Sequence, residues 1–436
     1  MTFLYRILRR ATSDAGRVYL GKTHVENGNL IPKGEPFIFV ANHPSSLLDP
    51  LVCAGYLGVP IYFLGRADLF KKKLVAKFLR ATHMWPIYRS IDGKDSLSKN
   101  EQVFKECYAS LKEGNPILLY GEGFTDEQFV RRVKKIKKGA VRIAMGAELE
   151  YDFNLNIKIV PIGINYTNPE NLGSDLIIRV AEPIKIKDYK AKYDQNNVKT
   201  LLEITDELEK KIQNQIIHVK DSGDLKSFEK LIQLDECSMH YSTSDGVPSL
   251  SKRWEKTKWL SEKINGLQNE EKESIFKKVN SFWNDVNVPT AELFIIRGLK
   301  STRINIFSEI IILLIGSPIA LLGLVVNLPL FILLKKIPPK LTRRSTFYPG
   351  MKVAFGAILT PILLLIECTL ILPFVETPYL LPIFLVGGIL SGVVAVKYLV
   401  VWKRFLRKIY AKRRLREGDR ESLQMKYNEL IQIINS

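Results

Sequence analysis

Short apolar runs alternate with stretches of helical spacing over residues 17–190. The apolar runs predict strands at 37–41, 60–64, 117–120, 158–164 and 175–180, and the stretches between them predict helices at 46–56, 72–82, 98–113 and 138–148. This alternation is typical of an α/β domain whose mainly parallel sheet is flanked by helices. Because open α/β sheets bind ligands at the carboxyl ends of their strands, we expect the chemistry where these strands end.

The pattern changes twice further along the chain. Helical spacing dominates after the last predicted strand, with an apolar stripe that includes Leu201, Leu208 and Ile212. Long apolar runs then begin near residue 304. We therefore divide the chain into an α/β domain at 1–195, a helical insert or bridge at 196–303, a membrane region at 304–402 and a basic helical tail at 403–436.

The membrane region holds three apolar runs, at 308–334, 353–375 and 379–401. Each is long enough to cross a bilayer core of roughly 30 Å. Basic clusters flank the runs near residues 297–303, 335–344 and 403–414, and three simple crossings would place the last two clusters on the opposite face from the first. Positive residues favour the cytoplasmic side, so a re-entrant segment or broken hairpin at 308–334, turning at Gly316–Pro318, would remove the conflict. Three full spans with the tail outside are the alternative. The α/β domain is expected on the cytoplasmic face in both.

The composition limits the classes of partner that the protein is expected to bind. The 436 residues carry a net charge of +19, which suits nucleic acid, a membrane surface or a phosphorylated substrate. The sequence has no nucleic-acid motif and no basic–aromatic interleaving, so apolar runs beside basic clusters favour anionic lipid. Residues 1–11 fit an interfacial amphipathic helix and a packed surface helix equally well. The four cysteines have no metal-ligand spacing and are expected as free thiols.

The most informative block is Asn42-His43-Pro44-Ser45-Ser46-Leu47-Leu48-Asp49-Pro50. A histidine follows a predicted strand, and an aspartate lies six positions later, just inside a helix for which Pro44 suits the first position. Asp49 can then orient one imidazole nitrogen while the other acts as a base toward a hydroxyl. An ordinary Asn-His-Pro turn is the alternative.

A second block places Arg66 just after a predicted strand, in Phe63-Leu64-Gly65-Arg66-Ala67-Asp68. Its planar guanidinium can grip a phosphate through two hydrogen bonds at the sheet edge that carries His43. The alternative is a structural ion pair between Arg66 and Asp68 or another carboxylate.

The third block, Tyr120-Gly121-Glu122-Gly123-Phe124-Thr125, ends another predicted strand with a carboxylate between glycines. The glycines allow close backbone approach to a ligand, and Glu122 can hold an acceptor hydroxyl, although a plain surface turn also fits. The basic run at 131–138 precedes a predicted helix N-terminus, which favours anions. The fourth block, Val160-Pro161-Ile162-Gly163, indicates only a buried strand.

In this order the four blocks resemble the glycerolipid acyltransferase family, which includes lysophosphatidate and glycerol-3-phosphate acyltransferases. The resemblance covers roughly residues 17–190. The pair His43 and Asp49 resembles the family's catalytic base and its orienting acid, and Arg66 resembles the residue that binds the acceptor phosphate. The third and fourth blocks resemble the family's remaining two, so Glu122, Gly123 and Thr125 are expected to bind substrate.

Two departures from the family pattern stand out. Five residues separate His43 from Asp49 where four are commoner, as in a subgroup that includes fungal glycerol-3-phosphate/dihydroxyacetone-phosphate acyltransferases. We expect the turn at 44–46 to absorb the extra residue. In the third block Gly121 replaces a proline, and no arginine follows Thr125. The residues expected to supply that charge are Arg131, Arg132 and Lys138.

The resemblance implies a membrane-bound enzyme of phospholipid biosynthesis. It would transfer a fatty acyl group from acyl-CoA or acyl carrier protein to the hydroxyl of 1-acylglycerol 3-phosphate or a similar lysophospholipid, without a metal or prosthetic group. Glycerol 3-phosphate or dihydroxyacetone phosphate is the alternative acceptor. Its partners would be membrane lipid, the acyl donor and the acceptor, with no nucleic acid. A catalytically silent lipid-binding membrane protein is the alternative of another class.

Overall fold

The computed structural model describes residues 2–88, 96–287, 290–300, 304–374, 380–417 and 420–435. Its described part contains one eight-stranded sheet in the order β1-β7-β6-β2-β5-β3-β4, with β8 also paired to β6. The strands are β1 (Thr23–Glu26), β2 (Phe37–Ala41), β3 (Tyr62–Arg66), β4 (Met84–Ile87), β5 (Ile117–Tyr120), β6 (Lys158–Tyr166), β7 (Leu176–Val180) and β8 (Ile184–Lys185). The five strands from β6 to β4 are parallel, whereas β7 and β8 pair antiparallel to β6. The mainly parallel α/β fold predicted from the sequence is confirmed.

Strand β2 lies in the middle of the sheet, and all five of its residues are buried. Ile38 and Val40 face one core while Phe37, Phe39 and Ala41 face the other. A continuous apolar run is what a parallel strand covered on both faces requires. Ala41 lies opposite Tyr120 of β5, so the carboxyl ends of β2 and β5 meet at one edge.

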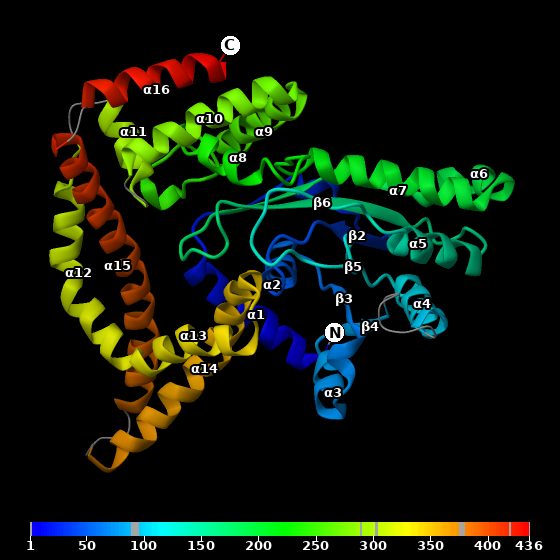
Figure 1. The fold of residues 1–436 in the computed structure, drawn as a ribbon. Helices are drawn as coiled ribbons and strands as arrows, with labels where there is room; N and C mark the ends of the chain where they lie inside the picture. The colour runs from blue at the N-terminus through cyan, green and yellow to red at the C-terminus, as the bar shows by residue number, and fades with distance from the viewer. Residues whose placement is uncertain are drawn as a thin grey trace.

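Helices cover both faces of the sheet (Figure 1). One face packs against α4 (Ser96–Lys112), α5 (Gly139–Glu150) and α7 (Asn197–Asn214), and the other against α1 (Phe3–Tyr19) and α2 (Leu48–Tyr56). The short helices α3 (Lys73–Ala81) and α6 (Lys190–Gln195) lie at the periphery. Ile204, Leu208 and Ile212 of α7 belong to the sheet core, so this core extends beyond the boundary predicted at residue 195.

A second, helical body has its own core. It contains α8 (Leu225–Ile232), α9 (Leu250–Gly266), α10 (Asn269–Val286), α11 (Glu292–Lys300) and α16 (Arg420–Asn435). The last helix buries Leu423, Tyr427, Leu430 and Ile434 in this core. The predicted basic tail therefore folds back and completes the helical body instead of forming a separate element.

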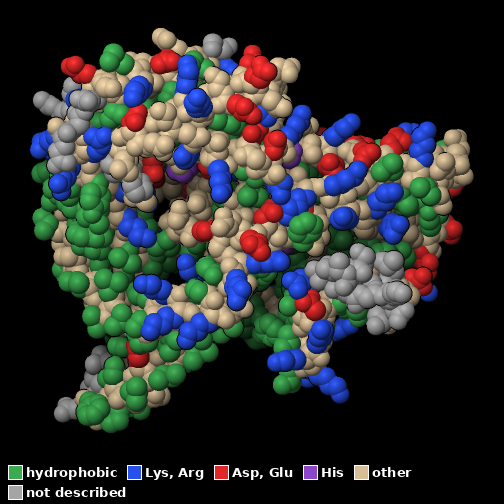
Figure 2. All heavy atoms as spheres, in the orientation of Figure 1, with side chains coloured by type: hydrophobic (Ala, Val, Ile, Leu, Met, Phe, Trp, Pro, Cys, Tyr) green, Lys and Arg blue, Asp and Glu red, His purple; other side chains and the backbone are tan. Residues whose placement is uncertain are grey.

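Within the described residues, three helices are long and apolar enough to cross a membrane, namely those at Phe307–Val326, Ser345–Phe374 and Leu381–Arg416. They correspond to α12 (Phe307–Val326), α14 (Tyr348–Ile371) with the short 3-10 helices on either side of it, and α15 (Leu380–Glu417), while α13 (Leu328–Leu341) connects the first to the second. Figure 2 shows apolar side chains gathered over α12 and over the tip formed by α14 and α15. The predicted runs at 353–375 and 379–401 lie in α14 and α15, and the turn between them falls outside the described residues.

The break in the first apolar run lies at Asn327, not at Gly316–Pro318 as the sequence suggested. Helix α12 continues through Pro318, with the Ser317 hydroxyl donating to the Leu314 carbonyl oxygen at 2.9 Å. Such side-chain bonds let apolar helices tolerate proline. At Asn327 the chain turns into α13, and its amide donates to the carbonyl oxygen of Gly388 at 3.0 Å. The helical segment is thus broken at a corner ten residues after Ser317, and whether it is re-entrant stays a prediction.

Candidate active site

The two residues of the first block meet at the carboxyl edge of the sheet. His43 follows β2, and Asp49 lies in the first turn of α2. The His43 Nδ1 atom is 2.7 Å from the Asp49 Oδ2 atom. Asp49 is fully buried, whereas the His43 side chain keeps 18% of its surface exposed. The bond assigns Nδ1 as the donor and leaves Nε2 as the nitrogen that can accept a proton.

The connecting turn accommodates five residues between His43 and Asp49. Residues 44–47 form turns, and Ser46 adopts the left-handed backbone conformation with φ of +38°. Helix α2 begins at Leu48, so Pro44 lies in the turn and not at the first helical position, which corrects the sequence prediction. A positive φ is uncommon for a residue with a side chain and is found where the surroundings enforce it.

Asp49 is held by two further donors. The Ser45 amide donates to Oδ2 at 2.8 Å, and the Tyr166 hydroxyl donates to Oδ1 at 2.9 Å. Tyr166 ends β6 and is completely buried. These bonds fix the carboxylate in the orientation that points it at the imidazole, as an acid that orients a base requires.

The imidazole itself is fixed by packing. The His43 ring stacks on Tyr120, with ring centroids 3.7 Å apart and planes 7° from parallel. Just before it, the Asn42 side chain forms two bonds with the backbone of Ile164, at 3.0 and 2.7 Å, and so continues the pairing of β2 with β6. The backbone and the ring of the histidine are thereby held at the end of the sheet.

Glu122 is bound by two backbone N–H groups of the protein. Its two carboxylate oxygens accept the backbone N–H groups of His43 at 2.7 Å and Lys134 at 3.0 Å. Burial raises the pKa of Glu122, and the two amide bonds act in the opposite direction. The structure therefore assigns Glu122 to positioning His43, where the sequence suggested a grip on the acceptor hydroxyl. Gly123 makes the tight turn, with φ of +76° and its amide 3.2 Å from the Tyr120 carbonyl oxygen.

Thr125 is also turned inward. Its hydroxyl lies 2.9 Å from the Ser46 hydroxyl, and the residue is buried. Thr125 thus contacts the turn that connects His43 to Asp49, and its role in substrate binding stays a prediction.

Arg66 ends β3 at the same sheet edge as His43, with β5 between their strands. Its guanidinium pairs with Asp68 through two bonds, at 3.0 and 2.5 Å, and its side chain is 45% exposed. The ion pair considered as the alternative is thus present. Because the pair is exposed, an incoming phosphate can still reach the guanidinium.

The three basic residues proposed to supply charge to the third block lie in different environments. Arg131 is buried and bonds Glu229 at 2.7 Å and the carbonyl oxygens of Tyr166, Thr167 and Met239, so it is structural, which corrects the prediction. Each of the three guanidinium nitrogens of Arg131 already donates to a protein oxygen, so we do not expect this residue to bind a phosphate. Arg132 lies 3.5 Å from Asp126, and Lys138 is the half-buried residue that precedes α5.

The N-terminus of α5 lies at the catalytic edge. The Lys137 amide donates to the Gly121 carbonyl oxygen at 2.8 Å, which brings the end of the basic run back to the end of β5. The exposed Lys137 side chain passes close to Gly123. Lys137, Lys138 and the helix N-terminus therefore present positive charge beside the third block.

Sequence reasoning overlooked the supporting residues Asn42, Tyr120 and Tyr166. Asn42 and Tyr120 lie in the first and third blocks, and all three stand at or within two residues of the end of a predicted strand. A polar or aromatic side chain at that position is the signal that could have identified them. Among the described residues, no group of three or more metal-ligating side chains comes together.

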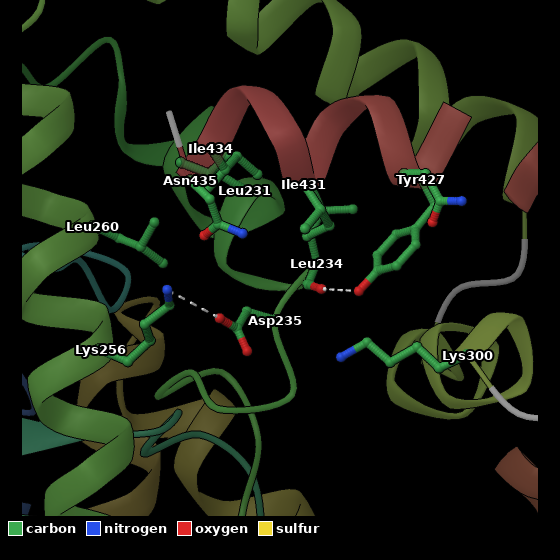
Figure 3. A pocket seen from close by; sticks show the side chains of 11 residues that line it. Leu231, Leu234, Asp235, Lys256, Leu260, Lys300, Tyr427, Ile431, Ile434 and Asn435 are labelled. Carbon is green, nitrogen blue, oxygen red and sulfur yellow. Dashed lines mark hydrogen bonds and ion pairs between the residues drawn. The ribbon is translucent and has the colours of Figure 1, made fainter. Parts of the chain in front are cut away.

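A separate cavity of about 360 Å³ lies in the helical body, between α8, α9, α11 and α16 (Figure 3). Leucine and isoleucine side chains form its apolar wall. Lys256 and Lys300 lie at its edge and pair with Asp235 at 3.8 Å and Glu236 at 3.2 Å, respectively. Their charges are therefore compensated, and none of the residues of the four blocks lines this cavity.

Residues 22–165 match the family model described as Acyltransferase. A stretch of 122 residues is 27% identical to glycerol-3-phosphate O-acyltransferase 1 of Saccharomyces cerevisiae, covering 27% of this chain and 16% of the relative. A stretch of 125 residues is 27% identical to the 1-acyl-sn-glycerol-3-phosphate acyltransferase of Bacillus subtilis, covering 28% of this chain and 57% of the relative. The family model and both relatives support a glycerolipid acyltransferase domain in this part of the chain. The match spans less than two thirds of either relative's length.

The blocks that carry the His43–Asp49 pair, Arg66 and Glu122 all lie inside the matched acyltransferase segment. Among solved structures, the 1-acyl-sn-glycerophosphate acyltransferase of Thermotoga maritima aligns with a TM-score of 0.35 and 19% identity, covering 48% of this chain and 79% of that one. The helical body and the apolar helices lie outside the segment matched by the family model.

Proposed function

We propose that this glycerolipid acyltransferase transfers a fatty acyl group from acyl-CoA or acyl carrier protein to the hydroxyl of 1-acylglycerol 3-phosphate or a similar lysophospholipid, in phospholipid biosynthesis. The observation that carries the proposal is the 2.7 Å bond between His43 and the fully buried Asp49, which leaves one imidazole nitrogen to act as a base. No metal or prosthetic group takes part in the proposed reaction.

The proposed reaction needs a base that accepts the proton of the acceptor hydroxyl and a site that binds the acceptor phosphate. His43 Nε2 takes the proton of the acceptor hydroxyl as the oxygen attacks the thioester carbonyl carbon. Asp49 stabilises the imidazolium that forms. The carbon–sulfur bond then breaks, and the departing thiolate takes the proton back from His43. The products are an ester and a free thiol, and no side chain becomes acylated.

The acceptor phosphate would bind at the edge formed by Arg66, Lys137 and Lys138. All three are exposed or half-buried and lie beside the strands that end at the site. Arg66→Ala should raise the KM for a phosphate-bearing acceptor roughly tenfold, in line with one lost charged hydrogen-bond donor. Arg80→Ala is a matched control, because Arg80 is equally exposed but pairs with Glu106 away from this edge.

A lipid acceptor is favoured by an apolar surface beside Arg66, made of Phe3, Leu4 and Ile7 of α1 with Leu69, Leu74, Val75 and Phe78 of the α3 region. All seven side chains are exposed, and Leu74 reaches 84%. The two helices meet where the Thr2 hydroxyl donates to the Ala81 carbonyl oxygen at 2.8 Å. Lys71, Lys72, Lys73 and Lys77 surround the patch, a combination that suits an anionic bilayer surface.

A substitution in this apolar surface can distinguish a lipid acceptor from a water-soluble one. Leu74→Glu should raise the KM for lysophosphatidate presented in anionic vesicles and leave turnover with glycerol 3-phosphate unchanged. Val198→Glu, at an exposed position of α7, is the control. If glycerol 3-phosphate is the true acceptor, it will be the better substrate and Leu74→Glu will have no effect on it.

The deciding experiment is labelled acyl transfer by detergent-purified protein, with glycerol 3-phosphate and lysophosphatidate offered in parallel. Wild type should turn over, and His43→Ala should lose at least three orders of magnitude in rate. Lipid binding without turnover in either protein would contradict catalysis and support a silent lipid-binding protein. The active domain is proposed to face the cytoplasm, because the basic clusters that flank the apolar helices lie with it.

A further inference from the structure

A segment of the membrane part reaches the catalytic turn. It comprises the short 3-10 helix Ser345–Phe347 and the start of α14. Thr346 is completely buried, and its carbonyl oxygen lies 3.4 Å from the Ser45 hydroxyl. Val353 of α14 lies in the sheet core that also contains Leu48 and Val52 of α2. The second apolar helix therefore begins inside the catalytic domain.

Three hydroxyl groups join this segment to the turn. The Ser46 hydroxyl lies 2.9 Å from that of Thr125 and 3.0 Å from that of Thr346. The Thr346 hydroxyl donates to the Asp126 carbonyl oxygen at 3.0 Å. Ser46 is the residue with the positive φ, so these bonds hold the one strained position between His43 and Asp49. Strained conformations at functional sites persist only when their surroundings determine them.

Gly350 brings α14 against the backbone of the same turn. A Cβ atom at this position would lie 2.4 Å from the Leu48 nitrogen and 2.5 Å from the Leu47 carbonyl carbon. Neither backbone atom can move without shifting the first turn of α2, which carries Asp49. Helix α14 thus has no freedom to approach or to tilt toward the turn without displacing the orienting acid.

We propose that Thr346 and Gly350 are positioning residues for the His43–Asp49 pair, so that the seat of α14 on the catalytic turn controls the rate of acyl transfer. The proposal rests on the proposed function for its catalytic consequence. A loosened turn leaves Asp49 free to lose its bond with His43 while the phosphate-binding edge at Arg66, two strands away, is unaffected. The effect should therefore fall on kcat and not on KM.

The test compares Thr346→Val, Thr346→Ser and Ser345→Ala in the full chain. Ser345 is a matched control, because it lies in the same segment as Thr346 but its hydroxyl bonds Glu127 and Glu170 instead of Ser46. We expect Thr346→Val to lower kcat about tenfold, equivalent to roughly 1.4 kcal/mol, with KM changed less than twofold. Thr346→Ser and Ser345→Ala should keep the wild-type kcat. The acid limb of the pH–rate profile should move to lower pH in Thr346→Val, because a less well held carboxylate stabilises the imidazolium less.

Hydrogen exchange of the peptide 43–49 gives a readout that needs no turnover. Faster exchange in Thr346→Val, but not in Ser345→Ala, with equal thermal stability would show that Thr346 holds the turn, even if wild type proved inactive toward every acceptor. An active wild type with unchanged kcat and unchanged exchange in Thr346→Val would overturn the inference and leave the proposed function standing. Gly350→Ala should act in the same direction and provides a second variant.

Discussion

The Tyr166 hydroxyl is the donor to Asp49 that lies farthest from it in sequence. Tyr166→Phe removes one donor from a buried carboxylate and should cost about 1–3 kcal/mol of stability together with a fall in kcat. Kinetics and thermal unfolding measure the two effects. Tyr19→Phe is the control, because this buried tyrosine in the same core bonds the Pro169 carbonyl oxygen away from the site. A similar loss of kcat in both variants would contradict a specific role for Tyr166.

Arg131 tests whether the basic run is a substrate site or part of the fold. Because it bonds one carboxylate and three carbonyl oxygens, Arg131→Met should lower the free energy of unfolding by about 3 kcal/mol and leave the KM of the folded enzyme unchanged. Lys138→Ala should do the reverse, raising the KM for the acceptor without loss of stability. Denaturant unfolding and steady-state kinetics on both variants decide the point.

At the residue scale, the sequence predicted contacts between residues that are close together in the chain. His43 and Asp49 are six residues apart and were paired correctly, since one turn joins them. Tyr166 and Thr346 lie 117 and 300 residues from their partners in the site, and no spacing rule spans such separations. Arg131 was misread because a charge run looks exposed, whereas here the chain alternates between buried and partly exposed positions along 131–134.

A buried ion pair fastens the helical body to the sheet. Arg253 of α9 and Asp175, just before β7, are both fully buried and 2.5 Å apart. Arg253→Met should cost about 3–5 kcal/mol, because it leaves the Asp175 charge buried without its partner. Lys278→Met, which breaks the exposed pair with Glu429, should cost at most about 1 kcal/mol. Equal losses of stability in denaturant unfolding would contradict this assignment.

Helix α1 is fastened by stacked rings. The His83 ring lies between those of Tyr5 and Tyr62, at 4.1 and 4.2 Å. Burial lowers the pKa of His83 to about 4. The unfolded chain therefore binds a proton below about pH 6.5 that the folded protein does not accept until about pH 4. Stability should fall as the pH drops through this window and should not change above it on account of this residue.

The comparison of His83→Phe with wild type tests this pH dependence. Phenylalanine keeps a stacking ring and cannot titrate, so the decrease in Tm from pH 7 to pH 4.5 should be smaller in the variant. His24→Phe, at an exposed position of β1, should follow wild type. His218 contributes in the same direction, because burial also lowers its pKa to about 4 and its Nδ1 accepts the Val133 amide.

Elements with strong apolar patterns were predictable and the others were not. The buried strands β2, β5, β6 and β7 were placed within two residues of their observed ends. Strand β1 was missed because Thr23–Glu26 is short and partly polar, and β4 was missed because it is short and contains Pro86. The corner at Asn327 was missed because proline and glycine are stronger sequence signals than one asparagine, although lipid-facing helices tolerate both.

At the scale of the whole molecule, the apolar helices are tied to the rest of the protein at both ends. Arg297 of α11 bonds Glu236, and Thr346 then contacts Ser46 of the catalytic turn. Beyond the tip of α14 and α15, Arg404 and Lys408 bond Glu309 near the start of α12, and Arg414 bonds the Val286 carbonyl oxygen. Small residues Gly323, Gly388, Ser391 and Gly392 let α12 and α15 pack closely along this path.

This arrangement predicts that the catalytic domain and the C-terminal helix lie on one side of the membrane. A membrane-impermeant thiol reagent should modify Tyr410→Cys and Val198→Cys from the same side, and Phe374→Cys, near the tip, should not react from that side. Cys237→Ser removes the partly exposed native thiol from the background. Reaction of Tyr410→Cys and Val198→Cys from opposite sides would restore the topology with three full spans.

The contact between Ser46 and Thr346 can form only late in synthesis. The catalytic turn leaves the ribosome 300 residues before the group that braces it. At about 5–20 residues per second, the turn waits roughly 15–60 s for its partner. The nascent chain would thus carry the His43–Asp49 pair without its brace until α14 has been made and delivered to the bilayer. If the brace is worth about tenfold in kcat, acyl transfer should reach its full rate only after α14 has been made and has packed on the turn.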